Sequence, residues 1–222
     1  MWHISACWKV NKKAHAVLSQ VHCATIVHDS RTFAKIYQVF VRPLLESSAP
    51  AWNPHKKGDV EALEKVQRRA LRMMSDIGHL SYEDKLKRLN IQSLESRRQR
   101  GDLIQTFKYL NHINDVDMPL FSFVRERHNK DTRSHADDHL VPEKANLNIR
   151  KYFFSNRVTT AWNSLPGEVK EAVSVNAFKN KYDSHIQSTW MLRCVHIFNY
   201  WTLLAFRNIF NVHTCVPDER YH

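Results

Sequence analysis

The sequence predicts an all-α protein, an irregular helical bundle with a long polar connection and a divergent C-terminal tail. Glycine is scarce, at 4 of 222 residues, whereas proteins built from strands and tight turns need many glycines. Apolar side chains recur in steps of three and four along several segments, which is the spacing of one helix face. Apolar residues make up 43% of the chain and charged residues 25%, a composition typical of a folded core.

The first predicted helix spans residues 30–46. Its apolar stripe consists of Phe33, Ile36, Tyr37, Phe40, Val41 and Leu44. Pro43 is expected to kink or stop this helix because proline has no amide hydrogen to donate. Residues 47–58 contain two further prolines and predict a loop.

The second predicted helix spans residues 60–76, with Asp59 as its N-cap and Gly78 after its end. Its apolar face comprises Val60, Leu63, Val66, Ala70, Leu71 and Met74. At about 100° per residue, a row of basic side chains falls on the opposite side. The row consists of Lys65, Arg68, Arg69 and Arg72.

Two further helices carry their own capping signals. Ser81, followed by an acid at Asp84, resembles a capping box and opens a short helix to about Leu89. Ser93 can cap a longer helix to about Ile113. The buried face of this longer helix is expected to hold Leu103, Phe107, Leu110 and Ile113. Its basic residues near the start are expected to face outward, and they are Arg97, Arg98 and Arg100.

The second half of the chain is less regular. Residues 114–148 are polar and show little periodicity, which predicts an irregular connection with a short element at 120–124. Residues 149–190 resume helical spacing, and Pro166–Gly167 should interrupt them. Ser174 can cap the last helix.

The tail and the cysteines bear on where the protein resides. In the divergent tail, 191–222, the apolar run 195–206 is shorter than the roughly 20 residues that a membrane-spanning helix needs, so no membrane partner is expected. The four cysteines are far apart, which favours a reducing compartment. The N-terminus shows no signal-peptide pattern. We expect an intracellular protein, nuclear or cytoplasmic.

The charge balance favours a partner that carries phosphate. Lys and Arg number 33 against 22 Asp and Glu, a formal net charge of +11. Neutralising phosphates releases counterions, so an excess of this size favours RNA or DNA. The guanidinium forks of the two arginine rows suit phosphate oxygens.

Salt bridges along the helix surface are the alternative role for part of these rows. Glu61 precedes Lys65 by four residues, and Glu64 precedes Arg68 by four. Arg69 has no acid four residues before it, and neither has Arg72.

The sequence gives little support for a catalytic or metal site. Asp137 and Asp138 are adjacent, as are carboxylates that hold catalytic magnesium, but polar residues flank them instead of two apolar strands. A solvated loop is therefore expected. His135 and His139 lie near this pair, but no predicted helix or third ligand would complete a transition-metal site. We expect no catalytic residue, no metal and no cofactor.

Another group of metal-ligand types lies near the N-terminus, and its spacing matches no zinc-binding motif. The group consists of His3, Cys7, His22, Cys23 and His28.

Four strings occur in a fixed order along the chain. They are IYQVFVRPLLESSAPAWNP, LEKVQRRALRMM, LSYEDKLKRLNIQSLESRRQRGDLIQTFKYLN and RKYFFSNRVTTAWNSLPGEVKEAVSVNAFKNKYD. Together they resemble the C-terminal part, following the palm, of jockey-like LINE-type (non-LTR) retrotransposon reverse transcriptases, which are RNA-directed DNA polymerases. The resemblance covers about residues 12–190. The chain departs from the family at Ser47, where the family usually has tyrosine, and the tail matches nothing in it.

The resemblance implies a thumb-like helical region over residues 1–113, whose helices from residue 30 onward grip template and primer. The family's catalytic aspartates precede the segment that matches residue 12, so contact with nucleic acid without polymerisation is expected. The alternative is an inert fragment or a protein-interaction module that self-associates through exposed apolar helix faces.

Overall fold

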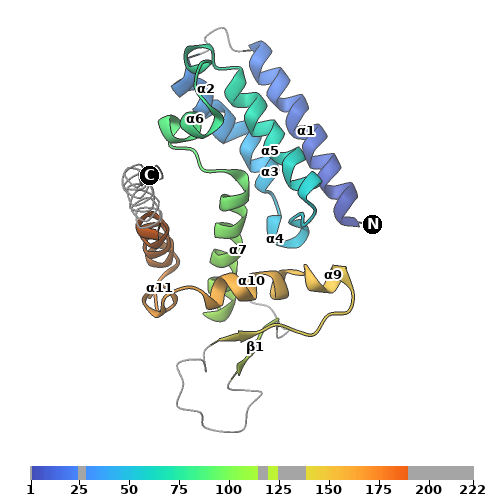
Figure 1. Cartoon of the computed structure of the whole chain (residues 1–222), viewed down its shortest axis with the longest axis vertical. Helices are drawn as coiled ribbons and strands as arrows, with labels where there is room; N and C mark the ends of the chain where they lie inside the picture. Colours follow the sequence, from blue (N-terminus) through green and yellow to red (C-terminus); the bar gives the residue numbers. More distant parts are fainter. Residues whose placement is uncertain (1, 25–28, 115–119, 125–138, 190–222) are drawn as a thin grey trace, which may run out of the picture. The chain divides into compact units, whose positions relative to one another are not determined.

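The computed structural model describes residues 2–24, 29–114, 120–124 and 139–189 (Figure 1). Of the described residues, 73% are helical, and the small remainder of regular structure is one two-stranded sheet. The predicted all-α class is therefore confirmed. The chain divides into two compact units, Met1–Leu165 and Pro166–His222. The first unit includes the predicted polar connection and the beginning of the predicted C-terminal helical segment.

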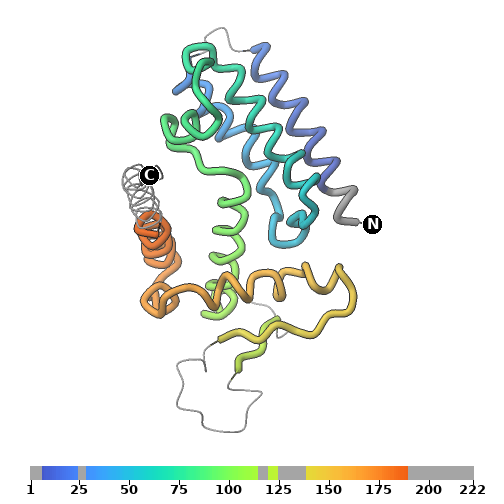
Figure 2. Tube along the Cα trace, viewed as in Figure 1, coloured from blue at the N-terminus to red at the C-terminus, as the bar shows by residue number. Residues whose placement is uncertain are grey.

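The described residues of the first unit form helices and one small antiparallel sheet. Its helices are α1 (Trp2–Ala24), α2 (Ser30–Ile36), the π-helix η1 (Tyr37–Val41), α3 (Arg42–Glu46), α4 (Ala49–Trp52), α5 (Lys57–Arg72), the 3₁₀ helix η2 (Ser75–Ile77), α6 (Tyr82–Leu89), α7 (Leu94–Leu110), α9 (Asn148–Lys151) and α10 (Phe154–Asn163). Its strands are β1 (Ser122–Phe123) and β2 (Leu140–Val141). Helices α1 and α5 run side by side in the same direction (Figures 1 and 2).

Helix α1 supplies one wall of the main core. Cys7, Ala14 and Leu18 are buried, and Val10, Val17 and Val21 pack against the same core. The steps of three, four and seven residues between them give one apolar stripe. This stripe was present in the sequence, although the sequence analysis assigned no helix before residue 30. The residues on the opposite side of the helix, such as Lys13, Ala16 and Gln20, are exposed.

The segment predicted as one helix over 30–46 contains a π-helical turn in its middle. Its buried residues recur every four positions, at Phe33, Tyr37, Val41 and Leu45. In a regular α-helix, a four-residue repeat advances by about 40° per step and leaves the core face. The wider turn of η1 offsets this drift and keeps all four side chains buried.

Pro43 explains where this wider turn occurs. Its ring cannot donate an amide hydrogen and crowds the carbonyl four residues earlier. The preceding amide, that of Arg42, donates to Tyr37 O, five residues back. Pro43 thus lies in the first turn of α3. Of the expected kink or stop, the stop does not occur, because the helical segment continues past Pro43 to Glu46. Phe40, predicted on the buried face, is 58% exposed because the wider turn rotates it outward.

The ends of α5 differ from the prediction. The helix begins at Lys57 after an N-cap at Lys56, so Asp59 lies within its first turn and is not the cap. The helix ends at Arg72, and η2 separates it from Gly78. Gly78 is in a right-handed conformation, with φ of −52°, so it does not serve as a left-handed cap. The predicted loop before α5 also contains the short helix α4, formed by Ala49, Pro50, Ala51 and Trp52.

The serine caps are confirmed. Ser81 accepts from the amide of Asp84 (3.2 Å), Ser93 from that of Ser96 (3.2 Å), and Ser174 from that of Ala177 (3.2 Å). At its other end α7 stops at Leu110. Ile113, predicted to be buried on α7, is 52% exposed because it lies beyond that end.

A chain of side-chain hydrogen bonds crosses the main core. Gln67 is fully buried on α5, where it accepts from the hydroxyl of Tyr37 (2.9 Å). Its amide nitrogen donates to the hydroxyl of Tyr82 (3.1 Å) and to Gln92 O (3.2 Å). The Tyr82 hydroxyl donates in turn to Glu64. Burial is the largest of the causes that raise the pKa of both tyrosines, so both hydroxyls keep their protons and donate hydrogen bonds.

Two asparagines of α10 hold the segment that contains β2 and the residues just after it. Asn163 accepts from the amide of Leu140 (2.9 Å) and donates to its carbonyl (2.9 Å). Asn156 accepts from the amide of Glu143 (2.9 Å) and donates to its carbonyl (3.3 Å). Each side-chain amide bonds both the N–H and the carbonyl of one residue, as a residue of a neighbouring β-strand would. These bonds explain how a segment with little apolar periodicity is held in place.

The second unit is described over residues 166–189. Pro166–Gly167 separates α10 from α11 (Gly167–Lys170), as predicted. A further helix runs over 175–189, and in it Phe178 and Tyr182 are buried with their rings nearly parallel (14°). Among the helices described in either unit, none has the length and apolarity needed to cross a membrane. The predicted tail and its apolar run lie outside the described residues.

We predict that removing Gln67 destabilises the fold more than removing any one of its partners. Tyr37→Phe leaves one carbonyl of Gln67 unsatisfied and should lower the free energy of unfolding by about 1–2 kcal/mol. Gln67→Leu removes three hydrogen bonds and leaves the buried hydroxyl of Tyr37 without an acceptor, so it should cost about 3 kcal/mol. Urea denaturation followed by circular dichroism measures both changes. The matched control is Gln20→Leu at an exposed position of α1, and an equal loss in the control would contradict the prediction.

Candidate nucleic-acid interface

The basic row on α5 separates into three exposed residues and one paired residue. Lys65, Arg69 and Arg72 are exposed. Arg68 is partly buried and forms an ion pair with Glu61, which lies seven residues earlier. The predicted alternative of ion pairs at a spacing of four is therefore replaced by a pair across two turns. Within the part of the chain that the structure describes, the three exposed cations form no ion pair.

Helix α1 adds polar groups to the same face. The Arg69 guanidinium lies within hydrogen-bond distance of Nδ1 of His15 (3.3 Å) and Oγ of Ser19 (3.3 Å). Arginine has no acceptor, so Nδ1 of His15 must be the acceptor and the ring must be neutral. His15, Lys65, Arg69 and Arg72, with Met73, line an open hollow of about 500 Å³. These side chains form what we call the α1–α5 basic face.

His15 is affected by its position on this face. Burial lowers the pKa of His15 below its ordinary value of 6.5, and the nearby positive charge of Arg69 lowers it further. The ring is therefore neutral near pH 7 in the folded protein and leaves the charge of the face to Lys65, Arg69 and Arg72. An anion bound beside Arg69 would favour the protonated ring.

The arginines of α7 do not form the predicted outward row. Arg97 forms an ion pair with Glu46 of α3, including a contact of 3.0 Å from its terminal nitrogen. Arg98 is only 3% exposed, so its predicted outward position was wrong. Arg100 is partly buried. The seven residues predicted to contact nucleic acid therefore do not share one surface.

The burial of Arg98 follows from a change of buried face along α7. Near its start the helix buries Leu94 and Arg98, and further along it buries Leu103 and Phe107. At about 100° per residue these two pairs lie on nearly opposite sides. The prediction extended the later face over the whole helix and so placed Arg98 in solvent. Burial lowers the pKa of Arg98, while the carboxylates of Glu64 and Glu95 raise it.

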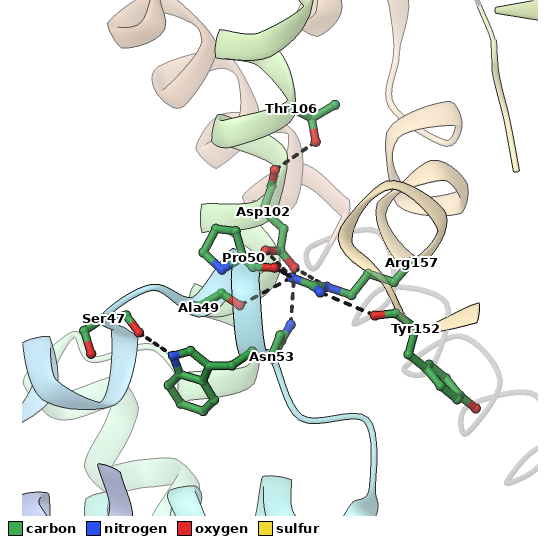
Figure 3. A network of polar contacts seen from close by, with 9 residues as sticks. Ser47, Ala49, Pro50, Asn53, Asp102, Thr106, Tyr152 and Arg157 are labelled. Carbon is green, nitrogen blue, oxygen red and sulfur yellow. Dashed lines mark hydrogen bonds and ion pairs between the residues drawn. The ribbon is translucent and has the colours of Figure 1, made fainter. Parts of the chain in front are cut away.

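A second cluster of charges lies where α4, α7 and α10 meet (Figure 3). Arg157 of α10 donates to both carboxylate oxygens of Asp102 (2.9 and 3.0 Å). The same guanidinium donates to Ala49 O (3.4 Å), Pro50 O (2.8 Å) and Tyr152 O (3.4 Å). We call this set of bonds the Arg157 clamp. Both partners of the ion pair are largely buried, with side-chain exposures of 15% and 7%.

The clamp borders a cavity of about 220 Å³ between α7 and α10. Arg98, Glu95, Gln99 and Asp102 of α7 line it together with Arg157. Neither terminal nitrogen of Arg98 has a hydrogen-bond partner among the described residues. Acidic and basic groups are mixed here, so the cavity does not offer the uniformly positive surface that a polyanion favours.

The remaining candidates from the sequence receive no support. The Asp137–Asp138 pair and His135 lie outside the described residues, as does His28. Over the described ranges, no three His, Cys, Asp or Glu side chains gather as metal ligands. Comparisons with protein-family models, with curated proteins and with solved structures found no match to this chain.

The sequence analysis missed the contribution of α1 to the basic face. His15 and Ser19 lie four residues apart and so share one side of a helix. The buried residues Ala14 and Leu18, on the adjoining side of the same helix, would have indicated the helix and hence this side. Nothing in the sequence indicated that this side would lie beside Arg69.

We predict that Arg69→Gln raises the pKa of His15 but leaves it below 6.5, because burial remains after the positive charge is removed. When folding lowers the pKa of a histidine, the protein loses stability as the pH falls from 6.5 through the pKa of the folded state. The reason is that the unfolded state takes up the proton first. Arg69→Gln should reduce that loss. An NMR titration of the His15 ring measures the pKa. Lys65→Gln is the control, and an equal shift in both variants would contradict the assigned cause.

We also predict that Arg157→Ala lowers the free energy of unfolding by about 3 kcal/mol, because it leaves the buried carboxylate of Asp102 without its partner. The double variant Arg157→Ala with Asp102→Asn should be more stable than Arg157→Ala alone, because no unpaired charge remains. Urea denaturation measures all three proteins. Equal stability of the single and double variants would show that the ion pair is not the source of the effect.

Proposed function

We propose that this protein binds RNA or DNA through phosphate groups, without reading sequence and without catalysing a chemical step. The observation that carries the proposal is the α1–α5 basic face, where three cations are exposed on one side of α5 and form no ion pair with described carboxylates. Phosphate contacts of this kind position a nucleic acid and carry no sequence information. The net charge of +11 supports the same partner.

The resemblance to the post-palm region of LINE-type reverse transcriptases supports the proposal from a separate direction. In that family the corresponding helices would grip template and primer. The proposal keeps Lys65, Arg69 and Arg72 as contact residues. It leaves out Arg98, which is buried, and Arg68 and Arg97, whose guanidinium groups pair with glutamates. A footprint of about three phosphates follows, which is small for a specific binder and suited to general affinity.

Self-association is the second candidate function, and one observation favours it. Val39 and Phe40 are adjacent on η1 and are 64% and 58% exposed. Exposed apolar side chains that adjoin one another promote association between chains. Sedimentation velocity over a range of concentrations distinguishes the two functions. A monomer that binds nucleic acid supports the first, and a dimer disrupted by Phe40→Ser supports the second.

We predict that the triple variant of Lys65, Arg69 and Arg72 to glutamine loses most of its affinity for duplex DNA at low salt. The logarithm of the binding constant should fall less steeply with the logarithm of salt concentration, by about three in slope, because about three phosphate contacts are removed. Fluorescence anisotropy across a salt series measures this.

The control is a second triple variant with the same loss of charge. It replaces exposed cations of α2 and α6 by glutamine, at Lys35, Lys87 and Arg88. Its salt dependence should match that of the wild type. If both triple variants lose affinity equally, net charge and not the α1–α5 basic face accounts for binding.

A further inference from the structure

Two aromatic rings are stacked face to face at the surface of the first unit. His55, in the turn before α5, and Tyr152, just after α9, have centroids 4.2 Å apart and planes inclined by 7°. His55 is exposed and Tyr152 is 37% exposed. The next residue, Phe153, is 38% exposed. An aromatic ring whose only role is to fill a core is normally covered by other side chains, so this degree of exposure is unusual.

The backbone on both sides of this stack is held by the Arg157 clamp. One terminal nitrogen of Arg157 donates to the carbonyls of Ala49 and Pro50, in the short helix that leads to His55. The other donates to the carbonyl of Tyr152 itself (Figure 3). The two rings come from distant parts of the sequence, but one buried guanidinium fixes both supports. The stack is therefore preorganised before any ligand arrives.

The surroundings of the stack are positively charged. Lys56 and Lys57 follow His55 directly and are exposed. The ammonium group of Lys151 lies 5.8 Å from the centre of the Tyr152 ring, and the guanidinium of Arg150 lies 5.4 Å from that of Phe153. Arg150 also pairs with Glu143, which removes it from the charge available to a ligand. Three lysines remain around the rings.

We propose that His55 and Tyr152, with Phe153 beside them, form a base-stacking platform for single-stranded nucleic acid. Lys56, Lys57 and Lys151 would contact its phosphates. Flat exposed rings bind the faces of unpaired bases, and the lysines match the adjacent phosphates. A duplex keeps its base faces covered by stacking, so it can use only the lysines. This inference goes beyond the proposed function because it concerns bases and because the residues lie outside the α1–α5 basic face.

An abasic oligonucleotide separates stacking from charge, because it keeps every phosphate and lacks every base. The full chain is titrated into fluorescein-labelled oligo(dT) of about 16 nucleotides, the upper end of a single-strand site size, and into an abasic strand of equal length. Wild type should bind oligo(dT) about tenfold more tightly, the effect of about one stacked base. The double variant His55→Ala with Tyr152→Leu should remove this preference and leave abasic binding unchanged.

Two further variants make the test specific. Tyr152→Trp keeps a flat ring and should retain the preference for bases. Trp8→Leu is the matched control, because Trp8 is also exposed (62%) and has a lysine 5.2 Å from its ring centre. This control should retain the full preference. If the double variant His55→Ala with Tyr152→Leu shows no thermal unfolding transition in circular dichroism, the single variant His55→Leu replaces it with the same expected result.

Each other outcome overturns the proposal. Equal affinity of the wild type for oligo(dT) and the abasic strand excludes stacking. If the double variant loses affinity equally for both strands, the two rings support the structure and do not bind bases. Tight binding of an apolar peptide in place of oligo(dT) would indicate a protein partner on Leu147 and Ile149, which are also exposed. The triple variant of the α1–α5 basic face should weaken both strands equally, so failure of the proposed function is recognised separately.

Discussion

The bidentate ion pair between Arg157 and Asp102 is the interaction on which the arrangement of the first unit depends. It joins α10 to α7, and the same guanidinium satisfies carbonyls of α4 and of the turn after α9. Burying two charges is costly unless they are paired and hydrogen-bonded, and here nearly every donor of the arginine has an acceptor. The bond therefore specifies one geometry, because a displaced helix would leave charge unpaired in the interior.

Periodicity in the sequence was sufficient to predict the helical class and the exposed side of α5, and the capping residues predicted the serine-capped helix starts. Periodicity alone had limits. It failed at Arg98, because α7 buries one side near its start and nearly the opposite side near its end. It also failed around Pro43, where a wider helical turn keeps a four-residue repeat on the core face. The two errors have different causes: α7 changes its buried face, whereas the segment around Pro43 keeps its buried face by changing its helical turn.

The two candidate sites could be predicted only in part, because each combines elements that are distant in the sequence. Arg69 stands out on α5, but its partners His15 and Ser19 come from a helix that lies beside it only in three dimensions. His55 and Tyr152 carry no signal in the sequence, and the Arg157 clamp binds the backbone at Tyr152 and in the helix that leads to His55. Local spacing identifies which side chains share a face, whereas tertiary contacts decide which faces meet.

The parallel course of α1 and α5 has an electrostatic consequence for the surface between them. Each peptide unit contributes a dipole along its helix axis, and in parallel neighbours the negative C-terminal ends lie together. The last turn of α1 carries His22, and the last turn of α5 carries Arg69 and Arg72. Arg69 and Arg72 offset the negative pole of α5, so the positive charge of the basic face is concentrated at one end of that helix. A polyanion lying there would meet a field that varies along its length and attracts it most strongly beside the two arginines.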